Sequence, residues 1–475
     1  MDVENRPLKI FFIPYLAAGH IIPLCDIAQF FASRAHHVTI ITTPSNAQYL
    51  NQSHNFRLHI LHFPSEEVGL PDGVENLTAV TDLQKSYRIH TATTLLRQPI
   101  ESFVEQDPPD CIVADFLYPW VHDLANKLRI PRLVFNGFSL FSICAMESVK
   151  TLSLHSSGPF AIPDFPHHIT MSSSPPKDMR EFLEPLLTMA LKSDGFIINN
   201  FVELDGEEYL RHYERTTGHK AWHLGPACLA RRTAREKAER GAKSVVSVQE
   251  CVSWLDSQRV NSVVYISFGT LCYFPDKQLY EIACAIEASG YGFVWVVPEK
   301  KEKEENEEEK EKWLPKGFEE RNGDKGMIIR GWAPQMIILN HPAVGAFLTH
   351  CGWNSTVESV ASGVPMITWP VHSDQFYNEK LITRVRGIGV EVGAEEWNLS
   401  AFFENEKLVG RACIEKAVRR VMDGADESLL IRRRAKEFGE TARQAVQEGG
   451  SSYNNLTALI DYLKRLRNSK PEPLR

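Results

Sequence analysis

The hydrophobic positions of the chain fall into short apolar runs separated by longer stretches of mixed character. In the first half these runs lie at 9–13, 38–42, 111–115, 132–135 and 196–199. They are rich in β-branched and aromatic residues, which is typical of buried strands. Because helical stretches lie between them, the pattern predicts a parallel sheet that is covered on both faces.

A second series of the same kind begins near residue 262. Its runs, again short and apolar, are 262–268, 293–297, 326–330, 345–349 and 365–369. The chain therefore predicts an α/β protein of two doubly wound, Rossmann-like domains. Each domain should place its ligand residues at the carboxyl ends of its strands, facing a central cleft.

A polar, charged stretch at 218–250 separates the two series, and we place the interdomain linker there. We thus expect a first domain over 1–240 and a second over 241–450, which suits a chain of 475 residues. The closing stretch, 451–467, repeats apolar residues on one helical face. We expect this helix to pack back on the first domain.

Composition excludes several classes of protein. The net charge of -8 gives no basic surplus, so we expect no nucleic-acid partner. The nine cysteines lack CxxC pairs, which argues against a disulfide framework and a zinc site and favours a reducing, cytoplasmic location. Prolines and glycines interrupt the apolar stretch at 8–24, so we expect neither a leader nor a membrane segment. The Glu- and Lys-rich run at 299–312 predicts a solvated surface segment.

Candidate chemistry is concentrated between Trp332 and Gln375. A predicted strand ends at Thr349, and a helix follows that should start at Asn354 or Ser355. A strand that leads into a helix N-terminus forms an anion site, because free backbone N–H groups and the helix dipole point at the ligand.

Side chains of this segment suit a nucleotide sugar. His350, Asn354 and Ser355 would add hydrogen-bond donors to the anion site, Trp332 offers a flat face to a base, and the Asp374–Gln375 pair suits sugar hydroxyls. Structural explanations exist for each feature. Ser355-Thr-Val-Glu358 also matches a capping box, the tryptophan could belong to the core, and Asp374–Gln375 could form a turn.

The first domain contributes His20 and Asp115. His20 follows Gly19 at a predicted strand-to-helix turn, with Pro23 in the first turn of the helix, and Asp115 ends another strand of the same sheet. Both should lie at one edge of that sheet. A histidine oriented by a buried carboxylate can act as a general base toward an alcohol, although His20 alone also suits a helix terminus.

The 44 residues from Trp332 to Gln375 resemble, without a gap, the plant secondary-product glycosyltransferase box. This box is the signature of plant UDP-dependent glycosyltransferases of family 1, and the resemblance extends over the whole chain. It implies the GT-B fold, with the acceptor held mainly by the first domain and a UDP-sugar donor by the second.

Carried onto matching positions, the resemblance assigns the nucleoside to four residues. Trp332 would stack on uracil, the backbone of Ala333 and the side chain of Gln335 would hold the uracil and ribose region, and Glu358 would bind the ribose hydroxyls.

The remaining donor contacts are implied in the same way. The residues placed around the diphosphate are Thr270, His350, Asn354 and Ser355, and Gly352 is also assigned to the donor site. Trp353, Asp374 and Gln375 would contact the sugar.

The resemblance also implies a reaction. His20, with Asp115 behind it, would deprotonate an acceptor hydroxyl, which attacks the anomeric carbon of UDP-glucose with inversion to a β-glucoside. We expect no metal and no cofactor, and a monomeric enzyme. The acceptor is a hydroxyl or carboxyl of a small apolar plant metabolite, with a triterpenoid of the saponin type favoured and a flavonoid or isoflavonoid as the alternative. Ala18 stands where many relatives have a polar residue, which concerns a possible extra phosphate contact rather than the base.

Two other functions would suit two doubly wound domains. A dinucleotide-dependent oxidoreductase should carry G-x-G-x-x-G after its first strand, and the stretch Pro14–Gly19 is a poor match. A non-catalytic protein that binds a UDP-sugar or a hormone would not need His20 or Asp115, and both are present.

Overall fold

Residues 6–50, 55–80, 83–150, 152, 158–230, 233–238, 240–298, 313–398 and 407–469 are described by the computed structural model of the protein. Contacts divide the chain into two units. The first comprises Met1–Leu140, Arg180–Arg232 and Arg443–Arg475, and the second comprises Phe141–Met179 and Thr233–Ala442. The Glu- and Lys-rich run at 299–312 lies outside the described residues.

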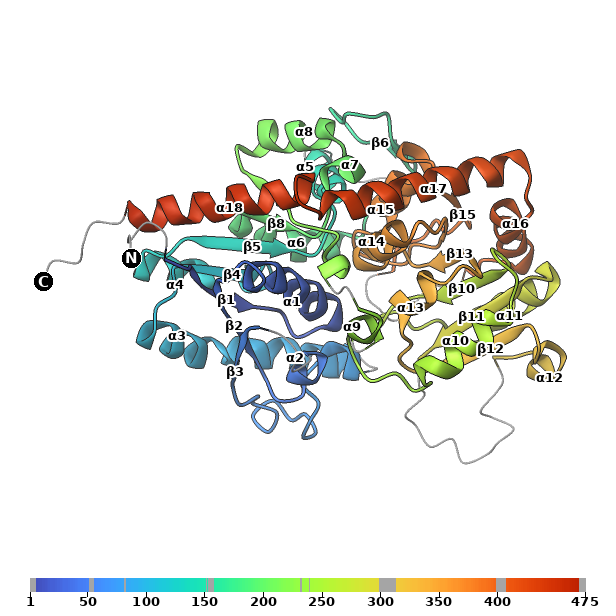
Figure 1. The fold of residues 1–475 in the computed structure, drawn as a ribbon, viewed down its shortest axis with the longest axis horizontal. Helices are drawn as coiled ribbons and strands as arrows, with labels where there is room; N and C mark the ends of the chain where they lie inside the picture. The colour runs from blue at the N-terminus through green and yellow to red at the C-terminus, as the bar shows by residue number, and fades with distance from the viewer. Residues whose placement is uncertain are drawn as a thin grey trace, which may run out of the picture. The chain divides into compact units, whose positions relative to one another are not determined.

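The sheet of the first unit has seven parallel strands in the order β3-β2-β1-β4-β5-β8-β9 (Figure 1). Their bounds are β1 Lys9–Ile13, β2 His37–Thr42, β3 Arg57–Ile60, β4 Cys111–Asp115, β5 Arg132–Asn136, β8 Gly195–Ile198 and β9 Ala221–His223. All five apolar runs predicted in this half are strands. Sequence reasoning missed β3, a largely exposed edge strand, and β9, which lies inside the stretch that we assigned to the linker.

The sheet of the second unit has six parallel strands in the order β12-β11-β10-β13-β14-β15. Their bounds are β10 Val263–Ser267, β11 Gly292–Val297, β12 Gly326–Arg330, β13 Val344–Thr349, β14 Met366–Thr368 and β15 Gly389–Glu391. The chain is thus an α/β protein of two Rossmann-like halves, as predicted. A small antiparallel pair, β6 Phe160–Ala161 and β7 Thr170–Met171, also belongs to the second unit.

Helices connect the strands throughout. The α-helices are α1 Ala18–Ala32, α2 Leu83–Leu95, α3 Arg97–Gln106, α4 Val121–Leu128, α5 Leu140–Val149, α6 Lys177–Ala190, α7 Val202–Asp205, α8 Glu207–Thr217, α9 Ala234–Ala238, α10 Val248–Asp256, α11 Asp276–Ser289, α12 Phe318–Asn322, α13 Gln335–Leu339, α14 Trp353–Ser362, α15 Gln375–Lys380, α16 Arg411–Met422, α17 Asp426–Ala445 and α18 Ser451–Asn468. Short 3₁₀ segments are η2 Asn46–Tyr49, η3 Leu77–Ala79 and η4 Ala227–Ala230, and η5 Leu381–Val385 is a π-helical turn. None of the described helices has both the length and the apolar character needed to cross a bilayer.

Strand β1 shows how the first sheet is covered. Successive side chains of a strand point to opposite faces. Ile10 and Phe12 pack in a core with residues of α1 and α18, whereas Phe11 and Ile13 pack in a core with residues of α2 and α3 (Figure 1). The apolar face of the C-terminal helix α18 is therefore buried against the sheet of the first unit.

In each sheet the strand order reverses beside the first strand, between β1 and β4 in one and between β10 and β13 in the other. Doubly wound sheets bind ligands outside the carboxyl ends of the strands at such a switch point. Asp115 ends β4 and His20 lies just after β1, while Thr270 follows β10 and His350 follows β13. These four residues thus lie at the switch point of their unit.

Candidate active site

His20 and Asp115 form a hydrogen-bonded pair at the switch point of the first unit. The Nδ1 atom of His20 lies 2.7 Å from Oδ2 of Asp115, whose other carboxylate oxygen accepts a bond from the backbone N–H of Leu117 at 3.0 Å. Asp115 is fully buried, whereas the side chain of His20 is 22% exposed. A carboxylate only accepts hydrogen bonds, so Nδ1 carries the proton and Nε2 holds the lone pair that a general base needs.

The local chain path brings the pair together. Helix α1 begins at Ala18, which puts His20 in its first turn and Pro23 in the second turn. Our prediction of Pro23 in the first turn was wrong, because the helix starts before His20 rather than after it. Pro23 lacks the N–H that would bond to the carbonyl of Gly19 four residues earlier, yet the helix continues through it to Ala32.

Aromatic side chains surround the imidazole of His20. Its ring centroid lies 5.8 Å from that of Tyr15 and 6.3 Å from that of Phe116, and the Tyr15 ring lies 5.4 Å from Tyr118. Phe138 extends this wall beyond Phe116 at 5.3 Å. Sequence reasoning missed these residues, although the first three directly follow β1 or β4, where site residues are expected. The wall suits an apolar ligand.

Tyr15 makes a second polar contact beside the pair, through a short hydrogen bond between its hydroxyl and Nδ1 of His90. Burial raises the pKa of Tyr15, while burial and the nearby His20 lower the pKa of His90. Both groups are therefore neutral. A phenol hydroxyl is the stronger donor and an imidazole nitrogen the stronger acceptor, so we assign the hydroxyl as the donor and Nδ1 of His90 as the acceptor. Sequence reasoning missed His90, which lies within α2, far from any strand end.

In the second unit, the chain runs from β13 through a tight turn into α14. The helix begins at Trp353 with Gly352 at its N-cap, earlier than the start at Asn354 or Ser355 that we predicted. Cys351 in the turn has a φ of +63°. The first N–H groups of a helix have no partner within it, so this turn presents backbone donors and the positive end of the helix dipole.

His350 occupies the same turn with its ring held between glycines. A Cβ atom on Gly269, whose φ is +74°, would lie 2.6 Å from Cε1 of His350, and one on Gly352 would also clash with this ring. Burial and the nearby His372 lower the pKa of His350, which is therefore neutral at physiological pH. Its Nδ1 atom is buried and makes no hydrogen bond within the described part of the chain. Thr270 follows Gly269 and is partly exposed.

The residues assigned to the nucleoside form a connected group. The side-chain –NH₂ group of Gln335 donates to Oε2 of Glu358 at 2.7 Å and to the hydroxyl of Ser355 at 3.2 Å. The side-chain oxygen of Gln335 accepts a bond from the hydroxyl of Tyr265 at 3.1 Å. Because Gly352, not Ser355, is the N-cap of α14, the segment from Ser355 to Glu358 does not form a capping box. The carboxylate of Glu358 is directed at other side chains instead.

Arg240 is a residue of this group that sequence reasoning missed. Its guanidinium pairs with Oε1 of Glu358, and the two side chains are only 8% and 6% exposed. The next residue, Gly241, packs on Trp332: a Cβ atom there would lie 2.9 Å from Cε2 of the indole. Arg240 lies in the polar stretch that we assigned to the linker, so its composition gave no sign of a buried partner.

The residues assigned to the sugar are buried and already oriented. The carbonyl oxygen of the Gln375 side chain accepts bonds from the backbone N–H groups of Val371 and His372 at 2.9 and 3.0 Å, which directs its –NH₂ group away from that turn. Asn378 donates to Asp374 at 2.7 Å and to the carbonyl of Cys351 at 2.9 Å. The contact with Cys351 connects α15, which follows Asp374, to the turn that precedes α14.

The other predicted residues lie in the same two segments. Trp353 is buried in the first turn of α14, Asn354 and Ser355 are partly exposed beside it, and Ala333 is buried before α13. In the described ranges, no group of three or more His, Cys, Asp or Glu side chains is placed to hold a metal ion. Metal independence stays a prediction.

Comparisons with known proteins all point to UDP-sugar transferases. Residues 240–404 match the family model described as UDP-glucoronosyl and UDP-glucosyl transferase. The chain is 46% identical to UDP-glucosyl transferase 73CC6 of Saponaria officinalis, covering 98% of this chain and 99% of the relative. It is also 46% identical to UDP-glucose flavonoid 3-O-glucosyltransferase 7 of Fragaria ananassa, covering 97% of each.

Among solved structures, it resembles Glycyrrhiza uralensis UGT73P12 complexed with glycyrrhetinic acid 3-O-monoglucuronide. The TM-score is 0.89 at 37% identity, and the match covers 98% of this chain and 97% of the other.

Proposed function

Because the chain belongs to the plant UDP-dependent glycosyltransferases of family 1 and has their GT-B fold, we propose that it transfers glucose from UDP-glucose to a triterpenoid, with inversion at the anomeric carbon. The observation that carries this proposal is the bond between His20 and the buried Asp115. It provides an oriented base for an acceptor hydroxyl.

The proposed reaction starts at Nε2 of His20. This nitrogen accepts the proton of the acceptor hydroxyl as its oxygen attacks the anomeric carbon of the donor. The bond between that carbon and the diphosphate oxygen breaks on the opposite face, so the α-linked donor yields a β-glucoside and UDP. Asp115 holds a proton on Nδ1 throughout and stabilises the imidazolium that forms when Nε2 takes the second proton.

The second unit supplies the donor site in this proposal. Trp332 stacks on the uracil, Glu358 and Gln335 hold the ribose, and the N-terminus of α14 with His350 faces the diphosphate. Negative charge grows on the diphosphate as the glycosidic bond breaks. Backbone N–H groups that are already oriented stabilise that charge without reorganising. Trp353, Asp374 and Gln375 contact the glucose.

The aromatic wall around His20 supports an apolar acceptor. A triterpenoid is favoured because the similar structure from Glycyrrhiza uralensis holds glycyrrhetinic acid 3-O-monoglucuronide. A flavonoid is the second candidate, because the relative from Fragaria ananassa is named a flavonoid 3-O-glucosyltransferase.

Oleanolic acid, 7-hydroxyflavone and UDP-glucose test the proposal directly. We expect a monoglucoside of oleanolic acid by mass spectrometry, with the large coupling constant of a β-anomeric proton by NMR. Turnover of the flavone alone would replace the triterpenoid by the second candidate. An α-glucoside would contradict the inverting mechanism.

A further inference from the structure

A second histidine lies beside the catalytic pair and has no part in the mechanism above. His90 and His20 both pack against the ring of Tyr15, with centroid distances of 5.6 and 5.8 Å. The two imidazoles are close enough for a charge on His20 to affect His90. Both imidazoles therefore lie within the reach of one small acceptor molecule.

The hydrogen bond from Tyr15 decides what His90 offers. Nδ1 of His90 accepts the hydrogen bond from the Tyr15 hydroxyl, so it carries no proton. The proton of the neutral imidazole is then on Nε2, which becomes a donor. Nε2 of His90 makes no hydrogen bond with any residue that the structure describes. Tyr15 is buried, so its hydroxyl holds the imidazole of His90 in one orientation through Nδ1.

A further neighbour of His90 is apolar. The ring of Phe182 on α6 meets it edge-on at 6.5 Å and is 55% exposed. His90 is thus a single fixed donor set between the aromatic wall and an exposed phenylalanine. Such a donor discriminates between ligands, because a ligand without a matching oxygen leaves it unpaired.

We propose that His90 is a specificity-determining residue whose Nε2–H donates to a second oxygen of the acceptor, close to the hydroxyl that is glucosylated. The preferred substrate class is then an apolar aglycone with two neighbouring oxygens, such as a 1,2- or 1,3-diol. This inference rests on the proposed function, because it assumes that the acceptor reacts at His20.

Two matched acceptor pairs test it. Hederagenin carries a hydroxymethyl group beside the 3-hydroxyl, and oleanolic acid has a methyl group there. 7,8-Dihydroxyflavone and 7-hydroxyflavone differ in the same sense. The wild-type enzyme should have the higher kcat/KM for the two-oxygen member of a pair. His90→Phe, which keeps a ring but removes both nitrogens, should lower that value about tenfold and change the other member less than about twofold.

Two further variants separate recognition from folding. His90→Gln carries an amide –NH₂ near the position of Nε2, and should recover part of the preference. Tyr15→Phe removes the hydroxyl that fixes the tautomer, and should reduce the preference without abolishing turnover.

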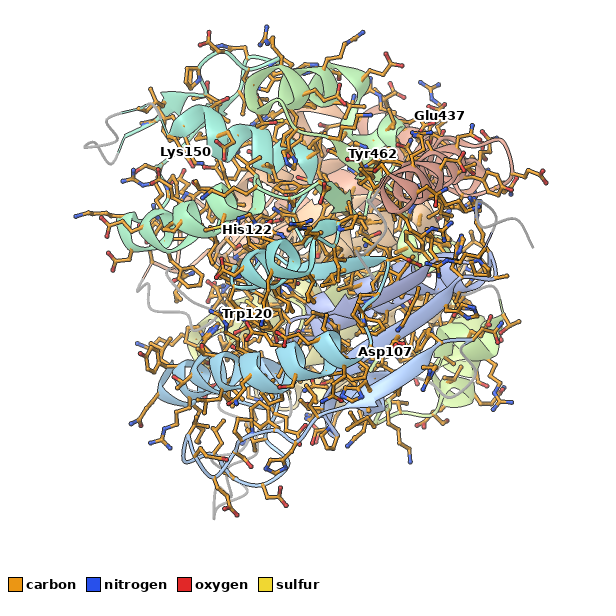
Figure 2. All side chains as sticks on the ribbon, turned by 90° about the vertical axis from the view of Figure 1, so that its left-hand side faces the viewer. Asp107, Trp120, His122, Lys150, Glu437 and Tyr462 are labelled. Carbon is orange, nitrogen blue, oxygen red and sulfur yellow. The ribbon has the colours of Figure 1, made fainter. Side chains whose placement is uncertain are left out.

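Matched controls are His122→Phe and Tyr462→Phe, on α4 and α18, at positions labelled in Figure 2. His122 bonds to Asn126 at 3.0 Å, and Tyr462 packs on Trp222. Both controls should keep the wild-type ratio.

The outcomes separate this inference from the proposed function. If the wild type glucosylates only the flavones, the triterpenoid assignment fails, and the flavone pair still decides the role of His90. If His90→Phe and His90→Gln lower kcat/KM equally for both members of every pair that reacts, or leave the ratio unchanged, the inference is wrong. A wild type that converts none of the four compounds would refute both.

Discussion

At the scale of single residues, the reaction depends on one proton transfer. An aliphatic alcohol barely ionises near neutral pH, and a base within hydrogen-bond reach typically contributes about 10²–10⁴ in rate. His20→Ala should therefore lower kcat by that order with oleanolic acid. The KM for UDP-glucose should barely change, because the donor residues belong to the other unit.

The Asp115→Ala variant should lose less activity than His20→Ala, or a similar amount if control of the tautomer dominates. The double variant should be no worse than the product of the single ones, since the two residues act as one unit. These variants should lose less kcat with a phenolic acceptor than with an aliphatic alcohol, because a phenol ionises more easily. Near wild-type kcat for His20→Ala with oleanolic acid would locate the base elsewhere.

Arg240 leads to a second prediction at this scale. It neutralises Glu358 where both side chains are almost buried, and removing one partner of such a pair leaves an uncompensated charge. Arg240→Ala should raise the KM for UDP-glucose several-fold, lower the melting temperature and change kcat little. Arg240→Lys, which keeps the charge, is the matched control. Its KM and melting temperature should lie between those of the wild type and Arg240→Ala. An unchanged KM in Arg240→Ala would show that Glu358 does not need this partner.

At the scale of elements, the turns after β10 and β13 form one structure around His350. Gly269→Ala should displace this ring as well as strain a backbone with a φ of +74°. We expect kcat/KM for UDP-glucose to fall about tenfold or more. Gly290 is the matched control, because its φ is +75° and a Cβ atom there would meet nothing within 4 Å. Gly290→Ala should cost about 1–2 kcal/mol of stability and keep the activity. Equal activity of the two variants would contradict a role for the His350 position.

The N-terminus of α14 supports a prediction about metals. If backbone N–H groups and the helix dipole meet the charge of the diphosphate, no cation is required for turnover. Excess EDTA should leave the initial rate essentially unchanged. Loss of activity in EDTA that Mg²⁺ restores would contradict this assignment.

At the scale of the whole molecule, stability should depend on pH through a buried neutral histidine. Nδ1 of His36 accepts a hydrogen bond from the backbone N–H of Leu8 at 3.0 Å, which joins β1 to the turn before β2. Burial, with the positive charges of Lys464 and Arg34, lowers the pKa of His36 from 6.5 to about 4. Between these values the unfolded chain binds more protons than the folded one, so stability is complete above pH 6.5 and falls as the pH drops toward 4.

The size of this effect is on the order of 1 kcal/mol at pH 5.5. Melting temperatures measured from pH 7.5 to 5.0 should fall on acidification, and His36→Gln should flatten part of that dependence. His37→Gln, at the exposed neighbouring position, is the control and should follow the wild type. Identical slopes for the wild type and His36→Gln would contradict the prediction.

Much of the architecture could be predicted because it depends on local pattern. Each of the ten apolar runs is a strand, because a short β-branched run between helical stretches has few other ways to bury its side chains. The pairing of His20 with Asp115 could be predicted for a related reason. His20 follows one strand and Asp115 ends another strand of the same parallel sheet, and the carboxyl ends of such strands meet at one edge.

Other features could not be read from the pattern. Strand β9 has three residues and lies in a polar region, and only its pairing with β8 makes it a strand. The start of α14 was misplaced because Ser355 resembles a cap, whereas Glu358 is held by Arg240 and Gln335. Those partners lie 118 and 23 residues away along the chain.

The sequence alone thus determined the two Rossmann-like halves, the family and the candidate base, because these follow from short-range periodicity and from one contiguous segment. Only the tertiary structure decided that Tyr15 fixes the tautomer of His90, that Arg240 completes the group around Glu358, and that glycine at 269 makes room for His350. Each of these depends on side chains that are distant in sequence and meet only when the sheets are packed. Such contacts leave no periodic signal in the chain, because a single polar residue on a helix or in a linker looks the same whether it meets solvent or a partner.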